Sequence, residues 1–242
     1  MQVESIDIFT TLAYIAAQRR SITLLTNFRG VPIKIRAHMM RLNRLSGQLH
    51  LLACQRQVVA LRPDQAVLLQ SELFPRPVTA RIARLDLQRQ TLVLQALAYS
   101  SGSVGQRVQP RVQPESPLSA ELRLNDGFTL KGRVIDLSPD GLSVSLPSQL
   151  LPLEQPCLPG CPLEIALGLP GWEGQIVDLQ LPAQVAYRVE DVQLPGYTRL
   201  GLLTQPNEHD QMVLRRYLFD RQTVILAEIQ ALNQGLLEVV TA

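Results

Sequence analysis

Residues 128–141 read F-T-L-K-G-R-V-I-D-L-S-P-D-G, and this stretch decides the fold of the second half of the chain. Its first part, residues 128–135, alternates apolar and polar side chains, which is typical of a half-buried strand. The residues Asn125-Asp-Gly127 just before it are a strong hairpin signal. Its last part, residues 136–141, consists mainly of turn-forming residues. We therefore expect an antiparallel strand bounded by tight turns.

Further apolar runs of strand length lie on both sides of this stretch, separated by turn-forming residues. In the second half, the expected strands are Leu118–Leu124, Phe128–Ile135, Leu142–Leu146, Leu163–Leu167, Gln175–Val177, Ala183–Val189 and Thr198–Leu203. In the first half, they are Ile22–Thr26, Val31–Ala37, Gln48–Leu52, Gln57–Leu61, Ala66–Leu69, Val78–Arg84 and Thr91–Leu97. Strands at this spacing indicate small antiparallel barrels or sandwiches. We expect a mainly β protein with one small antiparallel barrel in each half.

Helical periodicity appears near the two ends of the chain. Apolar side chains from Ile6 to Gln18 predict a short N-terminal helix. A longer C-terminal helix is expected from Glu208, with Asn207 as its N-cap and Gly235 able to end it. The solvated face of this helix is expected to carry Arg215, Arg216 and Arg221.

Between the two β-rich halves the apolar pattern stops. Residues 98–117 are rich in Ser, Gly, Gln and Pro, which is typical of an interdomain linker. We therefore predict three parts: an N-terminal β domain at 1–98, an arginine-bearing linker at 99–116, and a barrel with the C-terminal helix at 117–242.

Composition narrows the class of protein. The 242 residues are 46% hydrophobic and 18% charged, as in a globular protein, and the net charge of +2 is too small for a general polyanion binder. Three cysteines argue against a disulfide framework and fit a reducing compartment. The apolar stretch from Ile6 to Ala17 is too short to span a bilayer. The expectation is a soluble cytoplasmic protein with no membrane span.

Two short motifs occur in sequence, one in the predicted linker and one in the predicted barrel after it. The first is Arg107-Val-Gln-Pro-Arg111, and the second is Asp136-Leu-Ser-Pro-Asp-Gly141, with about 24 residues between them. In this order and spacing they resemble the RxxxR and (D/N)xSxxG signature of PilZ domains. Gln106 and Val112, beside the two arginines, also resemble that family.

The resemblance extends to the end of the predicted barrel. Residues 198–203 resemble the last barrel strand of PilZ domains, and the helix from Glu208 resembles the C-terminal helix of flagellar-brake-type members. The N-terminal β domain is similar in architecture to the PilZ-associated barrel of that type. In all, the resemblance covers roughly Gln106 to Leu232.

The resemblance implies a receptor for cyclic di-GMP with no activity as an enzyme, no metal and no cofactor other than this ligand. It also implies the binding set, namely Arg107, Arg111, Asp136, Ser138 and Gly141. The implied protein partner is a flagellar motor component or exopolysaccharide and biofilm machinery. The protein is expected to be a monomer or homodimer.

The chemistry of these residues suits that ligand. Arginine forks bind phosphate oxygens or the N7/O6 edge of guanine, and the ligand offers two guanines and two phosphodiesters. An extended segment lets Arg107 and Arg111 lie up to ~13 Å apart, at ~3.3 Å per residue. Asp136 supplies acceptors for the N1–H and N2–H donors of guanine, and Ser138 adds a hydroxyl. We expect Gly141 to adopt a positive φ in the turn.

A mechanism follows from the position of the arginines in the linker. We expect residues 106–114 to lack apolar anchors and to be mobile without ligand, so that binding orders them and changes how the two domains face each other.

Two alternatives belong to other classes of protein. One is a PilZ-fold interaction scaffold that does not bind nucleotide, and the intact motif residues argue against it. The other is a single-stranded nucleic-acid binder, which would need exposed aromatic platforms, whereas aromatic residues make up only 5% of the chain. We therefore expect no nucleic-acid partner.

Overall fold

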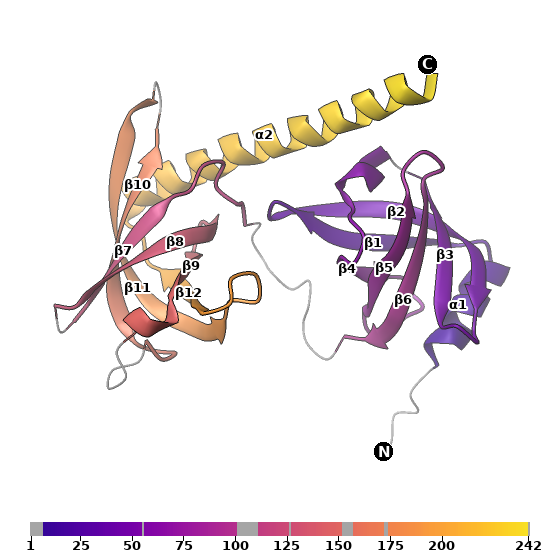
Figure 1. The fold of residues 1–242 in the computed structure, drawn as a ribbon, viewed down its shortest axis with the longest axis horizontal. Helices are drawn as coiled ribbons and strands as arrows, with labels where there is room; N and C mark the ends of the chain where they lie inside the picture. Colours follow the sequence, from indigo (N-terminus) through magenta and orange to yellow (C-terminus); the bar gives the residue numbers. More distant parts are fainter. Residues whose placement is uncertain are drawn as a thin grey trace. The chain divides into compact units, whose positions relative to one another are not determined.

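The computed structural model describes residues 7–54, 56–100, 111–125, 127–151, 157–171 and 174–241. Within these residues the chain forms two closed antiparallel barrels of six strands each, a short N-terminal helix and a longer C-terminal helix. Each barrel lies in its own compact unit (Figure 1). The mainly β fold with two barrels and two helices is thus confirmed. The domain limits 1–98, 99–116 and 117–242 stay predictions.

The first barrel follows a leading helix. Its elements are α1 (Ile8–Ala17), β1 (Ser21–Phe28), β2 (Val31–Asn43), β3 (Gln48–Ala53), β4 (Ala66–Gln70), β5 (Val78–Asp86) and β6 (Thr91–Tyr99). The strands close in the order β1-β2-β3-β6-β5-β4. Alternate residues of β1 and β2 are buried, as the period of two predicted. Asp7 caps α1 by accepting hydrogen bonds from the backbone N–H groups of Phe9 and Thr10.

The prediction of one strand in this barrel is wrong. Residues 57–61 lie largely in a short 3-10 helix, η1 (Arg56–Ala60), rather than in a strand. The N–H of Leu61 donates to the carbonyl of Val58 at 3.0 Å, and both side chains are buried. A five-residue apolar run fits a buried turn as well as a strand, so its periodicity could not distinguish the two.

The second barrel contains the quoted stretch. Its elements are β7 (Ser119–Leu124), β8 (Thr129–Ser138), β9 (Gly141–Pro147), η2 (Ser148–Leu150), β10 (Pro162–Pro170), β11 (Ile176–Glu190) and β12 (Tyr197–Thr204). The strands close in the order β10-β11-β12-β9-β8-β7. The predicted turn before β8 is confirmed, because Gly127 has a φ of +85° and donates its N–H to the carbonyl of Leu124.

The single strand β11 replaces two predicted strands, residues 175–177 and 183–189. Pro182 lies between them, and a proline usually interrupts a strand in the middle of a sheet. Here β11 pairs with β10 over residues 176–184, and β12 joins β11 only from Ala183 onward. The proline therefore precedes the doubly paired part of the strand, and the strand continues through it.

The C-terminal helix α2 (Glu208–Thr241) begins as predicted and ends later. The N–H of Asp210 donates to the side-chain oxygen of Asn207 at 2.9 Å, which confirms the N-cap. Gly235 does not end the helix, because its φ is not in the left-handed region that a C-terminal glycine cap uses. No helix in the described part of the chain combines the length and apolar character needed to cross a membrane.

Candidate ligand-binding site

The Asp-x-Ser-x-x-Gly motif forms the hairpin between β8 and β9. We expected the motif to follow a strand that ends at Ile135, and this is wrong, because β8 continues through Asp136 to Ser138. Ser138 pairs with Gly141 across a two-residue turn, so Gly141 is the first residue of β9. The motif side chains are therefore carried by paired strands, which hold them more rigidly than a loop would.

A β-bulge at Ile135 directs Asp136 outward. Val134 pairs with Val144 of β9, but the next pair is Asp136 with Ser143, so Ile135 is an extra residue. Without it, Asp136 would share the buried face of Val134, since side chains alternate along a strand. With it, Asp136 is partly exposed and Leu137 is buried instead. The bulge thus places the carboxylate at the barrel surface and leaves the core apolar.

The chain enters the second barrel alongside this hairpin. Val112 forms an isolated antiparallel bridge with Leu137, in which each residue donates its N–H to the carbonyl of the other, at 2.8 and 2.9 Å. Both side chains are fully buried or nearly so. Farther along, the N–H of Val134 donates to the carbonyl of Leu118 at 2.9 Å. The segment that carries the second motif arginine is therefore attached to β8.

This attachment brings Arg111 to Asp136. The Arg111 Nη1 donates to Asp136 Oδ1 at 3.1 Å, and the two side chains are only 20% and 19% exposed. In the antiparallel register set by Val112 and Leu137, the two residues are diagonal neighbours on one face, a distance that long side chains can span. The first motif and the second motif thus form one polar cluster.

Ser138 makes its contacts inside the hairpin. Its hydroxyl is 2.9 Å from Asp140 Oδ1 and 2.9 Å from the carbonyl oxygen of Gly141, and the residue is 2% exposed. Because a hydroxyl has one proton, it shares that proton between these two acceptors. Ser138 therefore fixes the shape of the turn beside Asp136.

The expected reason for Gly141 is wrong. Its φ is not positive, unlike that of Gly127 and Gly196. Instead, a Cβ atom at position 141 would overlap the backbone carbonyl oxygen of Leu202 in β12. The turn is also attached to that strand, because the N–H of Thr204 donates to the carbonyl of Asp140 at 3.0 Å. Glycine is needed here for close approach of two backbones.

The structure thus brings together four residues of the predicted set, Arg111, Asp136, Ser138 and Gly141. Arg107 and Gln106 lie outside the described residues. The expectation that residues 106–114 lack apolar anchors is wrong for the described part, because Val112 is fully buried.

Sequence reasoning missed Arg221 of α2, which was expected on the solvated face. The residue is 4% exposed, and its Nε donates to the carbonyl oxygen of Gln113 at 3.0 Å. It follows Leu214 and Leu218 at helical spacing, and both of these are buried. This spacing was the available signal, because it places Arg221 on the apolar stripe of the helix.

A second buried charge holds the turn between β11 and β12. The Asp191 side chain is fully buried and accepts hydrogen bonds from the backbone N–H of Gln193, at 3.0 Å, and from Arg199 Nη2, at 3.2 Å. Burial favours the neutral acid, but the Ser145 hydroxyl, the Gln193 N–H and the charge of Arg199 outweigh it and lower the pKa of Asp191 below its ordinary value. The pair stabilises the turn that lines one side of a small cavity.

That cavity, of about 320 Å³, begins directly beside the motifs. It is lined by residues 113–117, by Arg133 to Ile135 of β8, and by Asp191, Gln193 and Leu194. Gln113 lies two residues after Arg111, and Ile135 directly precedes Asp136. A ligand bound by the motifs could therefore extend into this cavity.

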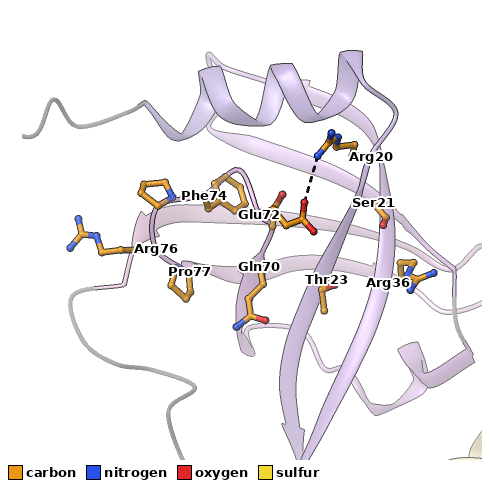
Figure 2. Close-up of a pocket in the computed structure, with 11 residues that line it drawn as sticks. Arg20, Ser21, Thr23, Arg36, Gln70, Glu72, Phe74, Arg76 and Pro77 are labelled. Carbon is orange, nitrogen blue, oxygen red and sulfur yellow. Dashed lines mark ion pairs between the residues drawn. The ribbon is translucent and has the colours of Figure 1, made fainter.

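A larger open groove, of about 760 Å³, lies on the first barrel. Its lining includes Arg20, Arg36 and Arg76, but Figure 2 shows that Arg36 and Arg76 lie at opposite ends and point away from each other. Arg20 is directed to Glu72, whose carboxylate is 3.8 Å away. The guanidinium groups therefore do not converge on one anion. Among the described residues there is also no group of three or more His, Cys, Asp or Glu side chains that could hold a metal ion.

Several solved structures are similar to this chain at low sequence identity. Bacillus subtilis inhibitor of motility, MotI/DgrA, is 15% identical, with 84% of this chain and 96% of that chain covered and a TM-score of 0.42. The K. pneumonia MrkH complex with c-di-GMP is 14% identical, with 93% and 97% covered and a TM-score of 0.46. Escherichia coli YcgR in complex with c-di-GMP is 15% identical, with 92% of each chain covered and a TM-score of 0.42.

No curated protein sequence matches the chain significantly. The model of the PilZ domain family, however, matches residues 105–220. This match begins just before the first motif and includes the whole second barrel with the start of α2. This match, together with the two motifs joined at Arg111 and Asp136, identifies residues 105–220 as a PilZ domain.

Proposed function

We propose that the protein is a receptor for cyclic di-GMP that acts by binding alone and regulates motility, biofilm or exopolysaccharide output through a protein partner. The observation that carries the proposal is the contact between Arg111 and Asp136 at 3.1 Å. It unites an arginine of the first motif with the carboxylate of the second on the surface of the PilZ domain.

The proposed roles follow from the chemistry of these groups. A guanidinium has five N–H donors, and the bond to Asp136 uses one of them, at Nη1. The other donors suit a phosphate oxygen or the N7/O6 edge of guanine. Arg107 supplies the second positive charge that a ligand with two phosphodiesters requires. Ser138 and Gly141 keep the turn in place.

Ligand binding is proposed to change how the domains face each other. Arg107 and Arg111 belong to the predicted linker at 99–116, and a ligand held against β8 would restrict that segment. Only a ligand with different affinities for two arrangements can shift their populations. The cytoplasmic location and the motor or exopolysaccharide partner are parts of the same proposal.

Isothermal calorimetry tests the function directly. Cyclic di-GMP should bind the full chain, whereas a single-stranded oligonucleotide of the same concentration should give no heat of binding. Arg111→Ala should weaken binding by about 1.5–3 kcal/mol, which is about 10- to 150-fold. Arg123→Ala is the matched control, since Arg123 lies on β7 of the same domain and pairs with Glu121 at 3.1 Å.

The alternatives are separated by the same measurement. No binding of cyclic di-GMP by the folded wild type would favour the interaction scaffold, and binding of the oligonucleotide alone would favour a nucleic-acid binder. Equal affinity of wild type and Arg111→Ala would remove Arg111 from the site.

A further inference from the structure

Arg221 is a charged residue at a position where the amphipathic pattern of α2 calls for an apolar one. Leu214 and Leu218, seven and three residues earlier, are 2% and 3% exposed, and Arg221 is 4% exposed. Burial of a charge is costly unless it is paired and hydrogen-bonded. An apolar side chain at 221 would complete the stripe without that cost. The residue therefore calls for an explanation beyond packing.

Two partners of Arg221, Gln113 and Glu115, belong to the segment that carries the ligand arginines. Its Nε donates to the carbonyl oxygen of Gln113 at 3.0 Å, and its Nη1 lies 3.7 Å from the Glu115 carboxylate. Glu115 is 72% exposed at its side chain, so the ion pair is weakly held, and the hydrogen bond to the backbone is the stronger contact. Arg221 thus binds the main chain two residues after Arg111.

The backbone of this segment explains why a side chain is needed there. Val112 directs both its N–H and its carbonyl toward Leu137 of β8. In an antiparallel pair the next residue directs these groups to the opposite side, away from β8. The carbonyl of Gln113 therefore faces away from β8, and Arg221 Nε supplies its hydrogen-bond donor. Pro114 follows and has no N–H of its own.

The segment is consequently held on two sides. Leu137 fixes Val112 from the barrel, and Arg221 fixes Gln113 from α2. Arg111 precedes both attachment points, and with the backbone on this course its guanidinium lies 3.1 Å from Asp136. A displaced Gln113 would shift the starting point of the Arg111 side chain.

We infer that Arg221 is a positioning residue for ligand binding: it orders residues 111–113 in advance and so couples the docking of α2 on the PilZ barrel to affinity for the ligand. The inference rests on the proposed binding of cyclic di-GMP at Arg111. Pre-ordering raises affinity because less conformational freedom is lost on binding. The coupling is reciprocal, so bound ligand strengthens the docking of α2 by the same factor.

Arg221→Met is the principal variant, because it keeps the length and burial of the side chain and removes the donors. Arg215→Met on the same helix is the matched control, since Arg215 is exposed. We expect Arg221→Met to bind cyclic di-GMP about tenfold more weakly at an unchanged thermal midpoint, and Arg215→Met to bind as wild type does. An unchanged affinity in Arg221→Met would overturn the inference.

A double-mutant cycle distinguishes positioning from a general structural role. If Arg221 acts through Arg111, Arg221→Met should weaken binding much less in an Arg111→Ala background than in the wild type. A tenfold loss in both backgrounds would show that the two residues act independently and would refute the positioning role. Should Arg221→Met not fold, Arg221→Lys replaces it, and loss of the fold in both would make Arg221 a structural residue only.

Hydrogen exchange without ligand separates this inference from the proposed function. The amide protons of Val112 and Leu137 should exchange faster in Arg221→Met, whereas those between β10 and β11 should not change. Unchanged exchange at Val112 would overturn the inference whether or not the ligand binds. Absence of cyclic di-GMP binding in the wild type would instead refute the proposed function and the coupling that rests on it.

Discussion

Replacement of Gly141 by alanine should destabilise the PilZ domain through steric overlap. The added Cβ atom would overlap the Leu202 carbonyl oxygen, and its next neighbours are the carbonyl carbon of Leu202 at 3.3 Å and the Cα atom of Leu203 at 3.5 Å. All three belong to the backbone of β12, so no flexible side chain can move aside. Strands β9 and β12 would have to separate at the end that holds the turn.

The size of the effect follows from the cost of overpacking, which is about 1–3 kcal/mol. Because backbone atoms are involved, we expect about 2–3 kcal/mol at Gly141. For a unit of this size, that corresponds to a fall of roughly 5–15 °C in the midpoint of thermal unfolding. Affinity for cyclic di-GMP should also fall, since the turn carries Ser138 beside Asp136.

Chemical denaturation and calorimetry of Gly141→Ala and Gly141→Asn test this reasoning. Asparagine tolerates a positive φ better than alanine does but is larger, so at position 141 it should be the more damaging replacement. Gly127 is the control, with a φ of +85° and no atom within 4 Å of the added Cβ, so there asparagine should be the milder change. A more stable protein with asparagine than with alanine at 141 would refute the close-approach explanation.

Four further predictions concern single groups. Asp136→Ala should reduce the preference for cyclic di-GMP over cyclic di-AMP, measured as a ratio of dissociation constants; an unaltered ratio would remove Asp136 from base recognition. Because the pKa of Asp191 is lowered from 3.8, its contribution to the free energy of unfolding should be present above pH 4 and lost on further acidification, and Asp191→Asn should lack this dependence in urea titrations. Burial raises the pKa of Tyr217 above 10.0, so wild-type stability should fall as the pH rises beyond 10, and Tyr217→Phe should remove that loss. Gly235→Ala should stabilise the protein by up to about 1 kcal/mol, since Gly235 lies inside α2 with open space around it, and a lower stability would contradict this.

The sequence by itself determined the local elements of this protein. Alternation of apolar side chains located β8 and β9, and the Asn-Asp-Gly signal located the turn before β8, because these patterns depend on near neighbours in the chain. The cap at Asn207 was predictable for the same reason, since its hydrogen bond to Asp210 spans three residues. The motifs at residues 107–111 and 136–141 could also be recognised from the sequence, although only by their resemblance to the PilZ signature.

Local patterns gave wrong predictions where the same residue type is compatible with more than one backbone structure. Residues 57–61 are apolar because they are buried, and burial is compatible with a 3-10 turn as well as with a strand. Two separate strands were expected at residues 175–177 and 183–189, but β11 continues through Pro182, because β12 pairs with β11 only beyond this proline. Gly235 indicated a helix end, but a glycine ends a helix only when its backbone adopts the left-handed cap.

Only the tertiary structure decided how the site is assembled. The Arg111–Asp136 pair joins residues 25 apart in sequence, and the Arg221–Gln113 bond joins residues 108 apart. The first depends on strand register and on the extra residue Ile135, and the second on the packing of α2 against the segment that enters the barrel. Such contacts arise when separate elements pack, and a one-residue slip in register would reverse the face of every side chain. The spacing of Leu214, Leu218 and Arg221 within α2 indicated that Arg221 is buried, but only the folded chain showed that it binds Gln113 and that Gly141 meets the backbone of Leu202.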